Sequence, residues 1–276
     1  MDLKQAAIST AMLVFVVSSM LGMGLGLRVA EIIAPLRNLP RVLLALIANF
    51  VVMPAVAIGL ARLLGLEESM GIGLLLLGAA SGAPFLPKLA QIAKGNLPFA
   101  VGLMVLLMVI TVGYLPLVLP QLLPGVAVNP AEIATSLVLL MLLPLGAALA
   151  VNAYRPGIAA RLKPGLDTVA NFGLMAVIGL LTLFNIRSVL AVFGTGGILA
   201  GLLFLAVGLG VGWLFGGASR ENRAVLGLGT AQRNIAAALV VARSFTDPNV
   251  VVMVVVVAIV GLFLLMPLSR ALGRPA

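Results

Sequence analysis

The sequence contains neither cysteine nor histidine among its 276 residues. Without cysteine there are no disulfides, thiol nucleophiles or thiolate metal sites. Without histidine there are no imidazole metal ligands and no histidine-based acid–base catalysis. Together with the absence of acidic residues from the expected membrane core, this argues against the usual nucleophile–base and metal constellations of enzyme active sites.

Charged residues are also scarce, at 9% of the chain, whereas 62% of the residues are hydrophobic and the mean hydropathy is +1.25. Several apolar runs exceed the roughly 18 residues that mark a membrane helix. The net charge of +9 would suggest nucleic-acid binding in a soluble protein. Here the basic residues lie in short loops between apolar runs, so membrane topology explains them better. We expect one all-α domain, residues 1–276, embedded in a bilayer.

The apolar runs predict nine membrane spans separated by short loops with proline and glycine turn signals. The run at 6–27 is too long for the core of a signal peptide, so it counts as a span. The expected spans are residues 6–27, 41–65, 69–94, 97–123, 131–153, 166–186, 194–216, 221–244 and 249–270.

Basic residues in the loops predict an orientation for these nine spans. If the loops alternate sides, one side collects Arg28, Arg37, Arg41, Lys94, Arg155, Arg161, Lys163, Arg220, Arg223, Arg270 and Arg274. The other side collects only Lys4, Arg62, Arg187 and Arg243. Since basic loops stay in the cytoplasm, we expect an inner-membrane protein with its N-terminus outside and its C-terminus inside.

Acidic residues are expected only at helix ends and in loops, with none in the membrane core. The eight are Asp2, Glu31, Glu67, Glu68, Glu132, Asp167, Glu221 and Asp247. Cation-coupled carriers usually place a carboxylate within the membrane, so this pattern argues against such coupling.

Two of the nine spans are interrupted by residues that do not suit a continuous membrane helix. Residues 81–88 read Ser-Gly-Ala-Pro-Phe-Leu-Pro-Lys, and residues 230–234 read Thr-Ala-Gln-Arg-Asn. Glycine, proline and charge at membrane depth are tolerated where the backbone lines a cavity or is buried in protein. One broken helix in each half of the chain points to the central site of a secondary transporter. We expect Gly82, Pro84, Pro87 and Gly229 to mark the breaks.

Four stretches in this order resemble the bile acid:sodium symporter family (SBF or BASS), whose bacterial members include ASBT-like carriers. They are residues 23–27 (Met-Gly-Leu-Gly-Leu), 49–54 (Asn-Phe-Val-Val-Met-Pro), the break at 82–87 with 89–96 after it, and 229–239. The resemblance implies a panel domain and a core domain related by inverted repeats, with two crossed discontinuous helices. It also implies import of organic anions, usually with sodium. We expect the first helix of ten-helix relatives to have no counterpart here.

The chain departs from the family at the positions that hold sodium. Leu86 and Pro87 stand where sodium-coupled members have a serine–asparagine pair, and Leu228 replaces a glutamate. Hydroxyl residues of the next helix become Ala100 and Met104. Asn49 and Gln232 keep side-chain oxygens and form the candidate residual cation site. No cofactor is expected, and sodium binding is the disfavoured alternative.

Six residues at the breaks are the candidate substrate-binding residues: Ser81, Lys88, Thr230, Gln232, Arg233 and Asn234. Lys88 would attract an anion or carry a coupling proton, and the alternative is that it extends toward interfacial water. Arg233 suits bidentate contact with a carboxylate, phosphate or sulfonate. Its alternative is a structural clamp on backbone carbonyls freed at the break. The same structural alternative holds for the four uncharged residues.

The sequence therefore predicts a secondary transporter of a small organic anion, working by alternating access in a lipid bilayer, with no nucleic-acid partner. Uniport, exchange or proton-linked transport is favoured over sodium symport, which is the alternative. A remote alternative is an intramembrane Ser81–Lys88 dyad enzyme, but the prolines between the two residues disturb their helical register.

Overall fold

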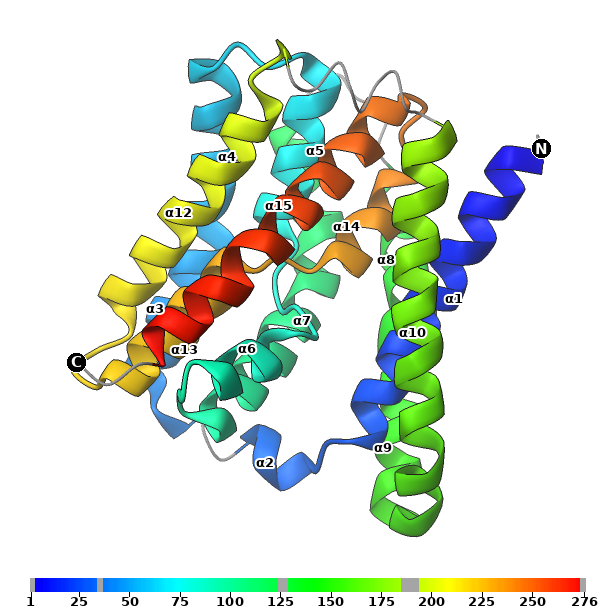
Figure 1. Ribbon diagram of the computed structural model, residues 1–276, viewed down its shortest axis with the longest axis vertical. Helices are drawn as coiled ribbons and strands as arrows, with labels where there is room; N and C mark the ends of the chain where they lie inside the picture. Colours follow the sequence, from blue (N-terminus) through cyan, green and yellow to red (C-terminus); the bar gives the residue numbers. More distant parts are fainter. Residues whose placement is uncertain (1–2, 34–36, 124–128, 185–193, 274–276) are drawn as a thin grey trace.

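The fold is all-α. A computed structural model describes residues 3–33, 37–123, 129–184 and 194–273, which contain helices and no strands (Figure 1). The helices are α1 (Leu3–Leu25), α2 (Val29–Ile33), α3 (Leu39–Ile47), α4 (Met53–Leu63), α5 (Glu68–Ala79), α6 (Leu86–Ile92), α7 (Leu97–Leu122), α8 (Pro130–Leu137), α9 (Leu143–Tyr154), α10 (Pro156–Phe184), α12 (Gly197–Phe215), α13 (Arg220–Ala231), α14 (Ile235–Ala242) and α15 (Pro248–Leu272). Short π-helical turns, η2 (Ala48–Val52) and η3 (Val138–Leu142), join α3 to α4 and α8 to α9.

Within the described residues, seven helical stretches are long and apolar enough to cross a membrane. This confirms an all-α polytopic membrane protein. The count of nine spans and the inverted-repeat relation stay predictions. The order of elements is nevertheless similar in the two halves, since the pair α5 and α6 is followed by the long α7, and the pair α13 and α14 by the long α15.

Several helix starts are specified locally by a capping side chain. Asn38, Asn96, Asn129, Ser219 and Asp247 each accept a hydrogen bond from a backbone N–H of the first turn. Such caps satisfy N–H groups that have no partner within the helix. A proline follows each cap except Ser219, and its missing N–H is harmless at that position.

The helices form two groups that lie side by side in Figure 1. The panel group consists of α1, α8, α9 and α10, and α1 packs against both α9 and α10. The core group consists of α3 to α7 and α12 to α15, in which α13 packs on α12 and α5 packs on α4 and α15. Close approach of these helices depends on small residues, as is usual where lipid removes the hydrophobic driving force.

The panel helix α10 begins ten residues before the span expected at 166–186. The apolar run does begin near residue 166, but the helix starts at Pro156 and continues through Pro164. Asp167 is therefore not at a helix end, as expected, but eleven residues inside α10, which corresponds to about 16 Å of helix rise. A hydropathy pattern locates apolar surface, whereas a helix can extend through polar residues beyond it.

Candidate functional site

The first break separates α5, which ends at Ala79, from α6, which begins at Leu86. Gly82 within it has a φ of +80°. A Cβ at Gly82 would lie 2.2 Å from the backbone nitrogen of Met108 on α7, so the extended segment rests directly on that helix. Pro84 lies in the turn before α6, but Pro87 lies in the first turn of α6, where proline suits a helix start.

The second break is shorter and spans Gln232 to Asn234, between α13 and α14. Gly229 is not part of it. This residue lies inside α13, where a Cβ would come 2.9 Å from a methyl group of Leu86. The expectation that Gly229 marks the break is wrong: its role in the described structure is close packing of α13 against α6.

Asn234 joins the two breaks through hydrogen bonds. Its backbone N–H donates to the Ala80 carbonyl at 3.0 Å, and its Nδ2 donates to the Gly82 carbonyl at 3.0 Å. Its side-chain oxygen accepts from the Ala237 N–H and caps α14. Asn234 is fully buried, and its backbone N–H and side-chain Nδ2 both serve the contact between the breaks.

Arg233 is 3% exposed and donates five hydrogen bonds to oxygens from three segments. Its Nε donates to the Leu77 carbonyl at 2.7 Å, and one terminal nitrogen donates to the Gly78 carbonyl at 2.6 Å and the Asn49 carbonyl at 3.4 Å. The other donates to Asn49 Oδ1 at 2.8 Å and the Thr230 carbonyl at 3.0 Å. A guanidinium has five N–H donors, so none remains for a substrate. The geometry favours the clamp alternative for Arg233.

Asn49 supports this arrangement from the π-helical turn η2. Its Oδ1 accepts from Ser81 Oγ at 2.7 Å as well as from Arg233. Its Nδ2 donates to the Ala45 carbonyl at 2.9 Å and to Thr230 Oγ1 at 3.3 Å. Every polar atom of the Asn49 side chain is thus engaged, which argues against a free cation ligand here.

Two further residues contribute to the site although the sequence reading did not single them out. Thr111 on α7 accepts from the Ser81 N–H at 2.9 Å and donates to the Ser81 carbonyl at 3.1 Å. Tyr114 donates from its hydroxyl to the Phe50 carbonyl in η2. A single hydroxyl in a long apolar helix carries no distinctive sequence signal. Thr111 and Tyr114 are three positions apart and lie on the same face of α7.

The buried crossover cluster thus comprises Asn49, Ser81, Thr111, Thr230, Arg233 and Asn234, and each of these residues is at most 3% exposed. Ser81 Oγ donates to Asn49, so the hydroxyl is engaged in this cluster. Lys88 is exposed, so the structure does not bring a serine–lysine pair together as a catalytic dyad.

Lys88 and Gln232 are the two candidates that lie outside this saturated cluster. Lys88 is exposed on α6, whose opposite face carries the buried Leu86, Leu89 and Ala90. Its ammonium forms no hydrogen bond or ion pair with another described residue, and Gln91 is exposed on the same face. Gln232 is partly exposed, and its side-chain oxygen is buried without a hydrogen-bond partner in the described part of the chain.

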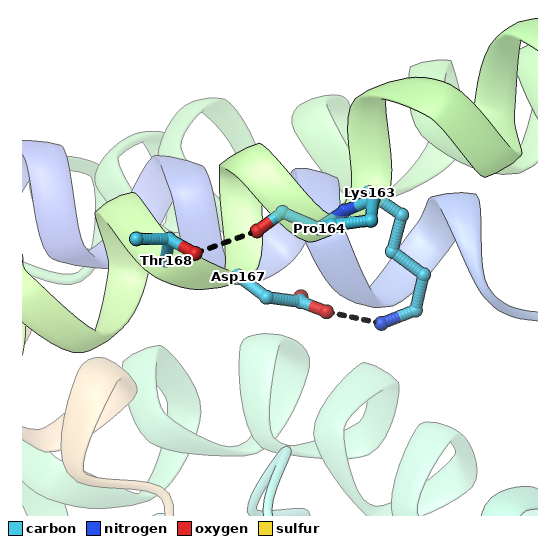
Figure 2. A network of polar contacts seen from close by, with 4 residues as sticks. All are labelled: Lys163, Pro164, Asp167 and Thr168. Atoms are coloured by element: carbon cyan, nitrogen blue, oxygen red, sulfur yellow. Dashed lines mark hydrogen bonds and ion pairs between the residues drawn. The ribbon is translucent and has the colours of Figure 1, made fainter.

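On the panel side, Lys163 and Asp167 of α10 form an ion pair one helical turn apart (Figure 2). Their side chains are 40% and 43% exposed. A Cβ at Gly22 of α1 would clash with the Asp167 carboxylate, and one at Gly26 would clash with the Lys163 stem. Thr168 donates to the Pro164 carbonyl at 2.8 Å in the same turn. Gly22 in α1 and Gly26 just after α1 therefore make room for the Lys163–Asp167 pair, whose two charges cancel.

The panel and core groups meet through α1 and α8 of the panel and α7 and α14 of the core, and α8 packs on α7. α14 packs on both α8 and α1, and one continuous cluster of buried side chains includes Ile133 and Leu137 of α8 and Val241 of α14. Nearer the start of α10, the panel group instead has a small apolar cluster of its own, formed by Leu25, Ala148 and Ala159. The apolar seal between the groups thus lies at the end marked by α8 and α14.

Comparison with known proteins agrees with this architecture. Residues 12–192 match the Sodium Bile acid symporter family. The chain is also similar to the "Uncharacterized sodium-dependent transporter YocS" of Bacillus subtilis (strain 168), with 27% identity over 217 residues that cover 76% of this chain. The chain spans 64% of the length of that relative. With a match over most of its helices and two broken helices in contact at its centre, the chain belongs to the Sodium Bile acid symporter family.

Proposed function

We propose that this protein is a secondary transporter of a small organic anion that works by alternating access without sodium. The family is named for symporters, which supports a membrane carrier rather than an enzyme. The observation that carries the choice of an anion is Lys88, an exposed cation beside a helix break with no acidic partner among the described residues.

The charge balance near the breaks supports an anionic ligand. Residues 80–85 and 232–234 contain no aspartate or glutamate. On the panel side the charges of Lys163 and Asp167 cancel, which leaves Lys88 as the uncompensated charge on α6. A carboxylate, phosphate or sulfonate near Lys88 would gain a charge-assisted interaction. Gln232, with its unpartnered side-chain oxygen, would orient polar groups of the same ligand.

The alternative is sodium-coupled symport of an organic anion or bile-acid-type molecule. The names of the family and of the Bacillus relative both refer to sodium. Against this, Leu228 stands at a position where the family resemblance predicts a glutamate, and Asn49 is saturated with hydrogen bonds inside the protein. We therefore favour uniport, exchange or proton-linked transport.

The proposed location is the inner membrane, with the N-terminus outside and the C-terminus in the cytoplasm. The excess of basic residues in one set of loops supports this orientation. The apolar seal between α8 and α14 would then close the outer side, because the loop before α8 and the end of α14 both face outward in that orientation.

The test is the thermal stability of the purified protein with acetate, benzoate, succinate, taurine and taurocholate, each in sodium and in choline buffer. A ligand that binds only the folded state raises the melting temperature by mass action. We expect at least one anion to stabilise the protein equally in both buffers. Stabilisation that requires sodium would contradict the proposal in favour of symport.

Lys88→Gln is the decisive variant for the anion site. Removing the ammonium should weaken binding of the anion identified in this screen by about tenfold or more, because a charge-assisted contact contributes about 1.5–3 kcal/mol. Lys94→Gln is the matched control, since Lys94 is also exposed but lies two residues beyond the end of α6. Equal affinity of Lys88→Gln and wild type would mean that Lys88 only extends toward interfacial water.

A further inference from the structure

The guanidinium of Arg233 lies where the carboxyl ends of two half-helices converge. Leu77 and Gly78 contribute carbonyls from the last turn of α5, and Thr230 contributes one from the end of α13. Carboxyl ends of helices carry partial negative charge. In transporters with broken helices, such ends and unwound carbonyls are the groups that bind a coupling cation. In this chain the same kind of oxygens bind the guanidinium of the Arg233 side chain instead of a free cation.

Each of these carbonyls lacks its helical partner for an identifiable reason. The Leu77 carbonyl would accept from the Ser81 N–H, but that group donates to Thr111. The Thr230 carbonyl would accept from the Asn234 N–H, which donates to Ala80 instead. The Gly78 carbonyl faces the break itself, since α5 ends one residue later.

The Asn49 carbonyl lacks a helical hydrogen-bond donor for a different reason. In the π-helical turn, the Met53 N–H donates to the Ala48 carbonyl instead of to Asn49. The next candidate donor is residue 54, which is a proline and has no N–H. The π-turn and Pro54 together leave the Asn49 carbonyl to Arg233. With Asn49 Oδ1, five oxygens surround the guanidinium and none is a carboxylate, while the ring of Phe204 lies 6.0 Å away.

We propose that Arg233 is a covalently tethered replacement for the coupling cation of this family. The cradle of five oxygens favours a single positive charge, and the guanidinium supplies it permanently. A cation attached to the chain cannot be exchanged with the solution, so the crossover stays assembled in sodium-free medium. This inference rests on the proposed sodium-independent transport and gives its physical cause.

The corollary is that removal of the guanidinium exposes a cradle that accepts a free monovalent cation. Arg233→Ala removes the charge and its donors but leaves all five oxygens in place. The melting temperature of the full chain, without any anion, would be measured for this variant in sodium, potassium, choline and methylguanidinium chlorides at equal ionic strength.

We expect the wild-type melting temperature to be the same in sodium and in choline. In choline, Arg233→Ala should have a lower melting temperature than the wild type. Sodium or methylguanidinium should restore a substantial part of this lost melting temperature, and the recovery should increase with the logarithm of the cation concentration. Arg243→Ala is the matched control, because Arg243 is exposed at the end of α14 and should show no such dependence. Arg233→Lys keeps a positive charge. Its melting temperature should therefore lie between those of the wild type and Arg233→Ala in choline, and it should not depend on the cation.

Two results would overturn the proposal. Wild-type protein stabilised by sodium but not by choline would have a separate cation site. If Arg233→Ala has the same melting temperature in all four salts, Arg233 is only a structural clamp and does not replace a cation. If Arg233→Ala does not fold, Arg233→Gln takes its place in the experiment. Folding of Arg233→Gln in sodium but not in choline would support the proposal. Failure of Arg233→Gln to fold in any of the four salts would contradict it. None of these measurements needs an anion, so a failed anion screen leaves this test intact.

Discussion

At the scale of single residues, the Asn49 side chain is a central member of the crossover cluster, with four hydrogen bonds. It accepts hydrogen bonds from Ser81 and Arg233 and donates to Ala45 and Thr230, so it links η2 to both breaks. A buried donor that loses its acceptor pays its full desolvation penalty, and a charged donor loses more. The strength of the cluster therefore depends on the complete satisfaction of its members.

Asn49→Ala should lower the free energy of unfolding by about 2–4 kcal/mol, because one N–H of the Arg233 guanidinium and the Ser81 hydroxyl would lose an acceptor. The measurement is reversible unfolding of the purified protein in detergent. Asn171→Ala is the matched control, since Asn171 is exposed on α10, and its effect should stay within about 0.5 kcal/mol. Equal effects of the two substitutions would show that the cluster contributes little to stability.

At the scale of elements, the breaks are held open by neighbouring helices rather than by proline alone. The extended residues after α5 lie on α7, where Thr111 binds both backbone groups of Ser81. Gly82 contacts the α7 backbone so closely that no side chain fits. Broken backbone inside a membrane is stable only when such partners replace its lost hydrogen bonds.

Gly82→Ala should destabilise the protein by about 3 kcal/mol or more, because a methyl group would clash with the Met108 backbone and a positive φ disfavours a side chain. Gly113→Ala is the control on α7 itself. A Cβ there meets no atom within 4 Å, so its effect should be neutral or slightly stabilising. Thermal unfolding of both variants checks the difference, and a wild-type melting temperature for Gly82→Ala would contradict the packing described above.

At the scale of the whole molecule, the panel and core groups meet along an apolar seal at one end. The seal includes buried side chains from α1, α8 and α14, such as Ile133, Leu137 and Val241. Alternating access requires this contact to open while each group keeps its own packing. Because the chain contains no cysteine, engineered pairs can test such movement without background reaction.

Cross-linking α8 to α14 should therefore stop transport. Thr135→Cys and Val240→Cys form a suitable pair, because both residues line the same pocket of about 500 Å³. A reducible bifunctional thiol reagent should abolish uptake of the anion found by the binding screen, and dithiothreitol should restore it. A cross-link inside the panel group, between Leu25→Cys and Ala148→Cys, should leave uptake largely unchanged. Full uptake across the α8–α14 cross-link would contradict opening at this seal.

Some features of the site could be predicted from sequence because they depend on local chemistry. A membrane helix containing Gly82 and Pro84 must break, and Asn234 next to an apolar run is a natural cap. The two breaks accordingly lie within the stretches expected, although Pro87 and Gly229 belong to helices. Asp167 was placed wrongly because α10 remains helical far beyond its apolar run.

The amino-acid sequence by itself determined the class of protein, the positions of the two helix breaks and the candidate residues, since hydropathy and helix-breaking residues act within a few residues of the chain. Only the tertiary structure decided what these residues do. Arg233 is saturated because carbonyls from residues 49, 77, 78 and 230 converge on it, and Lys88 is not, because α6 turns it away from the packed face. Partners so distant along the chain are chosen by packing, which no local pattern encodes.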